Sequence, residues 1–150
     1  MREEVNPPAV SSLMFARRKR LAEDVCAELR MAGLPAHRED DVELHCYGGA
    51  LVVAHPSAEL DVSVEWRQSD QMIRASIGLT EDFDGEELFE AAVRVAQEAS
   101  SGQAPALLRH TGVVSNQMTD AMIAILNSAG LSARRVTHGL CPYLIGVELL

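Results

Sequence analysis

Histidine and cysteine side chains are the residues of this chain with the chemistry to hold a metal ion. His138 and Cys141 are separated by two residues, a spacing that zinc sites use, and His45 directly precedes Cys46. Neighbouring residues of a strand point to opposite faces, so His45 and Cys46 cannot both reach one ion. The chain has three cysteines and no Cys-x-x-Cys pair. The sequence therefore predicts no metal ion and no other cofactor.

A run of carboxylates over residues 81–90 is the next candidate for ion binding. A calcium loop of the EF-hand type needs glycine at about its sixth position and glutamate at about its twelfth. Counted from Asp82, Gly85 is at the fourth position rather than the sixth, and the twelfth position is Val93 rather than glutamate. We therefore interpret the acids as side chains stabilised by the dipole at a helix N-terminus.

Nucleophilic catalysis has no recognisable signature in this chain. No Gly-x-Ser-x-Gly elbow is present, and Gly48-Gly49 is typical of a hairpin turn rather than of a phosphate-binding loop. The sequence favours a protein that is not an enzyme. The alternative is a small enzyme whose site leaves no local motif, for example one built around Cys46, His45 or His138.

Arg17-Arg18-Lys19-Arg20 is the one basic cluster, and it falls inside a predicted helix. Successive helix residues are about 100° apart, so the four side chains project all around the axis. This predicts that no face of the turn is deeply buried. The cluster is either a solvated helix end or an electrostatic contact, to nucleic acid or to the acidic middle of a second copy, and we count its residues among the expected partner-binding residues.

The charge of the chain is concentrated in its middle. The formal net charge is −9, and residues 41–100 carry thirteen acids against three bases. Such a field repels phosphate backbones and attracts cationic partners. Nucleic acid is therefore a disfavoured partner for the molecule as a whole.

Residues 104–150 nevertheless resemble a winged-helix DNA-binding domain. The matching features are the segment Ala106–Val113, a helix from Ser115, the turn Ala129-Gly130-Leu131 and a strand pair that carries Arg134 and Arg135. The resemblance implies a helix, a turn, a recognition helix and a wing, and a DNA-binding regulator as an alternative function. The exposed positions of the implied recognition helix contain no Arg or Lys, although base readout usually depends on arginine.

Hydrophobic periodicity predicts an α+β fold: one antiparallel sheet of about five to six strands with helices packed on one face. The expected order is helix, strand meander, helix, helix, strand pair. The segments Ala32–Arg38 and Ala129–Arg135 are similar, and each follows an amphipathic helix, which is typical of a shared glycine C-cap. The predicted elements are a helix over 12–31, strands over 42–46, 50–54, 62–66 and 73–79, a helix over 84–99, a short helix over 105–110, a helix over 115–128, and strands over 133–136 and 143–149.

The last predicted strand is apolar on both faces, so it is either a central strand or an interface strand. Three features support one expectation: the chain has no catalytic motif, its middle is acidic, and its last strand is apolar on both faces. We expect a binding or adaptor module that acts through protein contacts and self-associates as a homodimer. Its general character resembles that of secretion-chaperone or immunity proteins. The expected partner-binding residues are Arg17, Arg18, Lys19, Arg20, Glu43, Glu65, Tyr143, Ile145 and Val147.

The N-terminus bears on domain organisation and location. Residues 1–10 contain Pro7-Pro8 and no apolar segment of the signal-peptide type. We expect a flexible arm over 1–10, a single domain over 11–150, a cytoplasmic location and no membrane contact.

Overall fold

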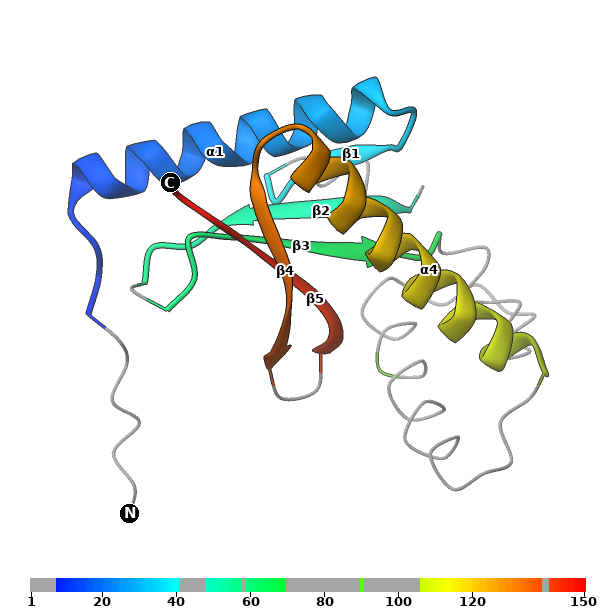
Figure 1. Ribbon diagram of the computed structural model, residues 1–150. Helices are drawn as coiled ribbons and strands as arrows, with labels where there is room; N and C mark the ends of the chain where they lie inside the picture. The colour runs from blue at the N-terminus through cyan, green and yellow to red at the C-terminus, as the bar shows by residue number, and fades with distance from the viewer. Residues whose placement is uncertain (1–7, 41–47, 58, 70–89, 91–105, 139–140) are drawn as a thin grey trace, which may run out of the picture.

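The computed structural model describes residues 8–40, 48–57, 59–69, 90, 106–138 and 141–150. Figure 1 shows two helices and one sheet in this part of the chain. The elements are α1 (Ser12–Met31), β1 (Ala36–Arg38), β2 (Gly49–Ala54), β3 (Val62–Arg67), α4 (Ala106–Ser128), β4 (Ser132–His138) and β5 (Cys141–Glu148). The sheet has five strands in the order β1-β2-β3-β5-β4. This is the α+β class that the sequence predicts.

The expectation of a wholly antiparallel sheet is wrong at one pair. β1 runs parallel to β2, with Ala36 opposite Ala50 and Arg38 opposite Val52, whereas the other neighbouring strands are antiparallel. Hydrophobic alternation reports the period of a strand but not its direction, and β1 is too short to show alternation at all. The expected strands over 42–46 and 73–79 lie outside the described residues, and so does the expected helix over 84–99 apart from Glu90.

Helix α1 has the bounds that its sequence predicts. The Ser11 hydroxyl accepts a hydrogen bond from the amide of Met14 at 3.2 Å, which caps the N-terminus. The buried side chains recur with helical spacing, so this face packs on the sheet. They are Arg18, Leu21, Ala22, Val25, Cys26 and Leu29.

Helix α4 corrects a second expectation. The short helix over 105–110 and the helix over 115–128 are one continuous helix. Glycine inside a helix costs only about 1 kcal/mol relative to alanine, and tertiary contacts outweigh that cost. The Gln68 amide donates to the Thr111 carbonyl at 3.1 Å and to Ser115 Oγ at 2.8 Å, which fixes the helix to the end of β3 on both sides of Gly112.

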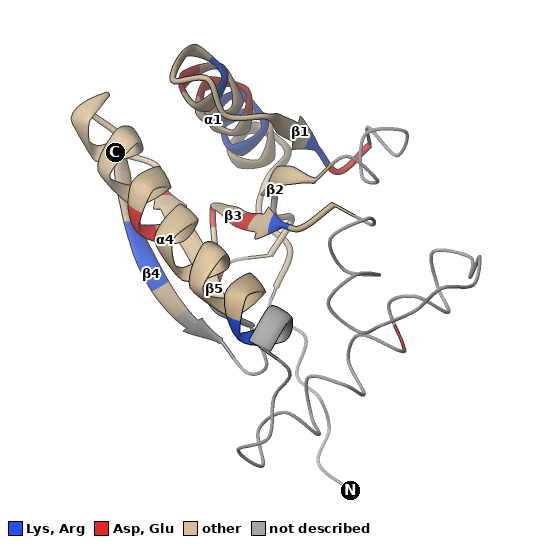
Figure 2. Ribbon diagram, turned by 90° about the vertical axis from the view of Figure 1, so that its right-hand side faces the viewer, with Lys and Arg blue, Asp and Glu red and all other residues tan. Residues whose placement is uncertain are grey.

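One face of the sheet carries the hydrophobic core. Val52, Val64 and Ile145 lie side by side across β2, β3 and β5, and all three are fully buried. Both described helices cover this face. Figure 2 shows that α4 is nearly free of charged residues, whereas α1 carries several. The helix side chains in the core are Leu21, Ala22, Val25, Cys26 and Leu29 from α1, and Met122 and Leu126 from α4.

The two similar segments end their helices in the same way. Gly33 has a φ of 89° and Gly130 a φ of 87°, the left-handed conformation that ends a helix. The leucine after each glycine donates its amide to a carbonyl of the last helical turn, at 2.9 Å for Leu34 and 3.1 Å for Leu131. We call residues 12–38 the first helix–strand unit and residues 106–138 the second.

A polar side chain also ties each helix to its strand. Arg30 donates from Nε and Nη2 to the Ala36 carbonyl at 2.9 and 2.7 Å. Asn127 donates to the Ala133 carbonyl at 3.0 Å and accepts from the Ala133 amide at 2.9 Å. The sequence similarity therefore corresponds to a shared local structure.

Candidate functional site

The side chains of the basic cluster divide between two environments. Arg17, Lys19 and Arg20 are exposed, whereas Arg18 is 4% exposed. The prediction that no face of this turn is buried is therefore wrong. An arginine can be buried when its guanidinium is paired, and the acid that pairs with Arg18 lies in a different part of the chain.

Arg18 holds together three segments that meet beside α1. Its Nη2 lies 2.8 Å from Asp61 Oδ1, and its Nη1 donates to the carbonyls of His55, at 3.0 Å, and Ser57. The second oxygen of Asp61 accepts the amide of Leu149 at 2.9 Å. Arg18 thus links α1 to the β2–β3 connection and to the end of β5, so its role in the structure is stability rather than partner contact.

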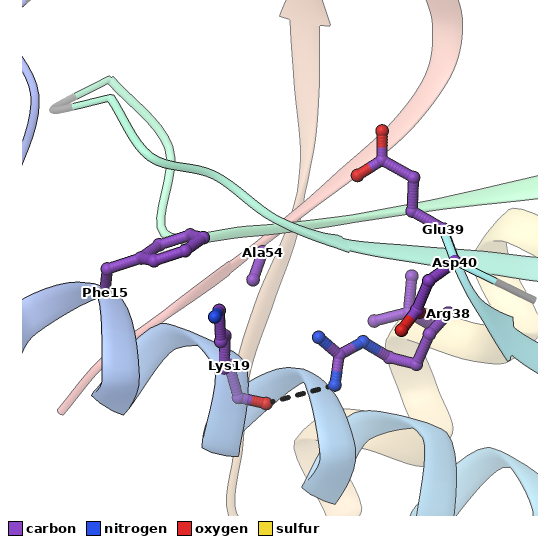
Figure 3. Close-up of a pocket in the computed structure, with 7 residues that line it drawn as sticks. Phe15, Lys19, Arg38, Glu39, Asp40 and Ala54 are labelled. Carbon is purple, nitrogen blue, oxygen red and sulfur yellow. Dashed lines mark hydrogen bonds between the residues drawn. The ribbon is translucent and has the colours of Figure 1, made fainter.

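Lys19 faces a hollow between α1 and the outer side of β2. The hollow has a volume of about 270 Å³ (Figure 3). Lys19 Nζ lies 4.6 Å from the centre of the Phe15 ring, a cation–π contact that forms one wall. The lining residues are Phe15, Lys19, Arg38, Glu39, Asp40, Val52 and Ala54.

A second hollow continues the first toward the N-terminus of α1. It has a volume of about 380 Å³ and shares Phe15 and Lys19 with the first. Its other lining residues are Ala9, Val10, Ser12, Ala16 and Pro56. We call the two hollows together the α1 groove, and it is the candidate functional site.

The groove exists because β1 ends early. β1 covers the outer side of β2 only as far as Val52, and the chain turns away at Glu39 and Asp40. Further along the same edge, Ala9 bridges Ser57 and the Val10 amide donates to the Pro56 carbonyl at 3.0 Å. In the described part of the chain, the stretch between these two pairings has no strand beside it. Residues 9 and 10, expected to belong to a flexible arm, are thus paired with the sheet edge.

Charge in the groove is mixed and partly uncompensated. Arg38 makes long contacts, 3.8 Å to Glu23 Oε1 and 3.4 Å to the Lys19 carbonyl. The Lys19 ammonium has the Phe15 ring as its described contact, with no carboxylate within ion-pair distance among the residues that the structure describes. The groove therefore offers an aromatic surface beside a cation that has no paired anion.

Ser63 and His55 form a hydroxyl–imidazole pair that sequence reasoning missed. His55 Nε2 lies 2.7 Å from Ser63 Oγ. Burial lowers the pKa of His55 below its ordinary 6.5, the Glu39 carboxylate opposes this shift, and the charge of Arg18 adds to it. A neutral imidazole beside a hydroxyl is the arrangement of a base and a nucleophile. Ser63 is only 5% exposed, however, so the pair satisfies a buried hydroxyl and gives a substrate no approach.

The remaining predicted partner-binding residues do not gather at one surface. Ile145 and Val147 are at most 1% exposed, because they belong to the hydrophobic core on the face that the helices cover. Their contact with a partner stays a prediction, which this burial disfavours. Tyr143 is half-buried, with its hydroxyl near Gly112 of α4. Glu65 is half-buried and lies 3.5 Å from Arg67 Nη2. Glu43 lies outside the described residues.

The winged-helix layout is also corrected. The turn that should separate two helices is part of α4, so residues 106–138 contain no helix–turn–helix. Arg134 donates to Glu148 Oε1 at 3.0 Å from Nη2, and Arg135 donates to Asn116 Oδ1 and Asp120 Oδ1, each at 2.8 Å. Both arginines of the expected wing are therefore engaged within the molecule. The DNA-binding alternative stays a prediction, without the helix–turn–helix that the resemblance implied.

Clusters of metal-ligating side chains and membrane-spanning helices are both absent from the described residues. His138 and Cys141 are cross-strand partners at the β4–β5 hairpin, and no group of at least three His, Cys, Asp or Glu side chains in the described ranges is placed to hold an ion. The pair His45 and Cys46 and the acidic run over 81–90, apart from Glu90, lie outside these ranges. Neither described helix is both long and apolar enough to span a bilayer.

Comparisons with known proteins give no relative for this chain. No protein family matches it, and no curated protein or solved structure is similar to it. The site must therefore be interpreted from its own geometry.

Proposed function

We propose that this chain is a non-enzymatic binding module of the adaptor or chaperone type, and that it acts through protein contacts made by the α1 groove. One observation carries the proposal: among the described residues, the Phe15 ring and a Lys19 ammonium with no carboxylate partner lie beside a stretch of sheet edge that β1 does not cover. An exposed sheet edge is a template for another chain, and natural proteins normally cover it.

The mixed character of the groove supports a protein partner over a small molecule. Its two hollows are open, and aliphatic, aromatic and charged groups alternate along them. Small-molecule sites, in contrast, are usually enclosed clefts that bury most of the surface of the ligand. Protein interfaces often have an aromatic residue at their centre and charged residues at their rim. In the groove, Phe15 lies beside the charged residues Lys19 and Arg38.

A photo-crosslinking experiment tests the proposal. A photoreactive amino acid at Ala16, which lines the groove, should form a discrete adduct with one protein in the cells that produce this chain. The same group at Asp24, an exposed position of α1, is the matched control. We expect an adduct from position 16 only, lost when Lys19→Glu is added. Equal adducts from both positions, or none, would contradict the proposal.

Self-association remains part of the proposal, although its expected contact changes. β5 is inside the sheet, and the edge strand β4 carries Arg134 and Arg135 at adjacent positions, which disfavours edge-to-edge pairing of two copies. The remaining route to a dimer is an electrostatic contact between the exposed Arg17 and Arg20 of one copy and the acidic middle of the other. Light scattering over a salt series should then show a dimer at low salt that dissociates at high salt. A monomer at low salt would remove this part of the proposal.

A further inference from the structure

Part of the outer edge of β2, at the floor of the groove, has no strand paired with it in the described part of the chain. The Ala50 amide donates to the Pro35 carbonyl on this side at 2.8 Å. Backbone groups of alternate strand residues point to the same side, so those of Ala54 point outward as well. β1 has already ended at the level of Val52, which leaves the Ala54 N–H and C=O facing the groove.

The molecule already uses this edge for extended chain. β1 adds to it in parallel before the gap, and residues 9 and 10 add to it in antiparallel fashion after the gap. An extended segment of a few residues in the gap would continue the same line of hydrogen bonds. The edge thus selects for a strand rather than for a helix or a compact ligand.

The wall of the groove indicates which side chains such a strand would carry. Phe15 and Lys19 are one helical turn apart, about 6 Å. Residues two apart in a strand point to the same face and are about 6.6 Å apart. A strand can therefore place an apolar side chain against Phe15 and Ala54 and, two residues away, a carboxylate against Lys19. Glu39 and Asp40, at the β1 end of the groove, disfavour a second acid next to the first.

From this geometry we infer that the α1 groove binds an extended peptide segment of a partner protein by strand addition to β2 at Ala54. The segment carries an apolar residue and an acidic residue two positions apart. This inference rests on the proposed function and names its partner class.

Panning of a phage-displayed random octapeptide library on the immobilised full chain tests the side-chain prediction. The wild-type chain should enrich peptides with an apolar residue and Asp or Glu two positions apart. Lys19→Glu should replace the acid by Lys or Arg, with a loss of affinity of about fivefold or more for a wild-type peptide. Arg109→Glu makes the same reversal of charge at an exposed position of α4 that does not line the groove, and it should leave the preference unaltered. No enrichment, or an unchanged preference in Lys19→Glu, would overturn the inference.

Hydrogen exchange with one enriched peptide tests the backbone prediction. The peptide should slow exchange at the Ala54 amide and leave the amides of β4, the other sheet edge, unchanged. Protection at β4 or nowhere in β2 contradicts strand addition. A specific photo-crosslink from position 16 combined with a failed library would leave the protein-binding function in place and reject only the linear strand as its ligand.

Discussion

The two helix–strand units share a helix ending but differ in the strand that comes after it. In both units a glycine in the left-handed conformation, a leucine and a buried alanine lead from helix to strand. The first unit continues into a short strand that is parallel to its neighbour, and the second into a longer antiparallel strand. As a result, α1 extends past the end of β1 and borders a groove.

The difference also appears in how each unit uses its cations. In the second unit, Arg135 crosses from β4 to Asn116 and Asp120 of α4 and closes the space between helix and strand. In the first unit, Arg18 is directed into the core and Lys19 into the groove. The same helix ending is therefore compatible with a unit whose helix and strand are bridged by side chains and with a unit that borders a groove. The two units differ in the length of the strand that follows the helix.

The largest expected difference between the units is in the cost of removing an arginine. Arg18→Met should lower the free energy of unfolding by about 3 kcal/mol, because Asp61 and two carbonyls lose their buried partner. Asp61 is 23% exposed, so water takes over part of the lost interaction. The expected cost is therefore at the lower end for a broken buried ion pair. Arg135→Met, which breaks an exposed pair, should cost less than about 1 kcal/mol. Urea unfolding of both variants measures the two values, and equal costs would contradict the contrast.

This contrast also shows how far the sequence predicts the fold. α1, β2 and β3 follow from local signals: a serine cap, a glycine stop and alternation of apolar residues. The direction of β1 and the continuity of α4 do not follow, because both depend on contacts with distant residues such as Gln68. Local chemistry determines where an element begins, and tertiary contacts determine its partner and sometimes its end.

The candidate site was predictable only in part. The sequence points to the basic cluster, and Lys19 does line the groove. It gives no means to separate Lys19 from Arg18, because the separation depends on where Asp61 lies in space. The spacing of Phe15 and Lys19 is visible in the sequence, but the groove itself depends on the turn at Glu39, for which the sequence has no strong signal.

A smaller effect tests whether the helix endings are equivalent. A Cβ added at Gly33 or at Gly130 meets no atom within 4 Å, so Gly→Ala at either position adds only backbone strain. Each variant should lose about 1 kcal/mol of stability, and Gly→Asn should lose less because asparagine tolerates this conformation. Thermal unfolding of the four variants measures this. A clear difference between the two positions in the loss of stability would contradict the expectation that the two helix endings are equivalent.

The smallest effect concerns pH, and it should arise at His55, which lies beside the first unit and not beside the second. His55 lies beside Arg18, Asp61, Ser63 and Glu39, and burial lowers its pKa in the folded protein below the ordinary 6.5. As the pH falls through 6.5, the unfolded chain takes up a proton at His55 before the folded chain does. The folded state therefore loses stability from about neutral pH down to the lowered pKa, below which this contribution stays constant.

Replacement of the imidazole should isolate that contribution. His55→Gln keeps a group that can hydrogen-bond to Ser63 but cannot titrate, so its free energy of unfolding should fall less than that of the wild type between pH 7.5 and pH 5.5. His110→Gln, at an exposed position of α4 in the second unit, should fall as the wild type does. If both variants keep the wild-type slope, the acid sensitivity arises elsewhere and the buried polar cluster beside α1 is not its source. If only His55→Gln flattens it, protons act on stability at the polar cluster beside the first unit, next to the edge that the groove leaves open.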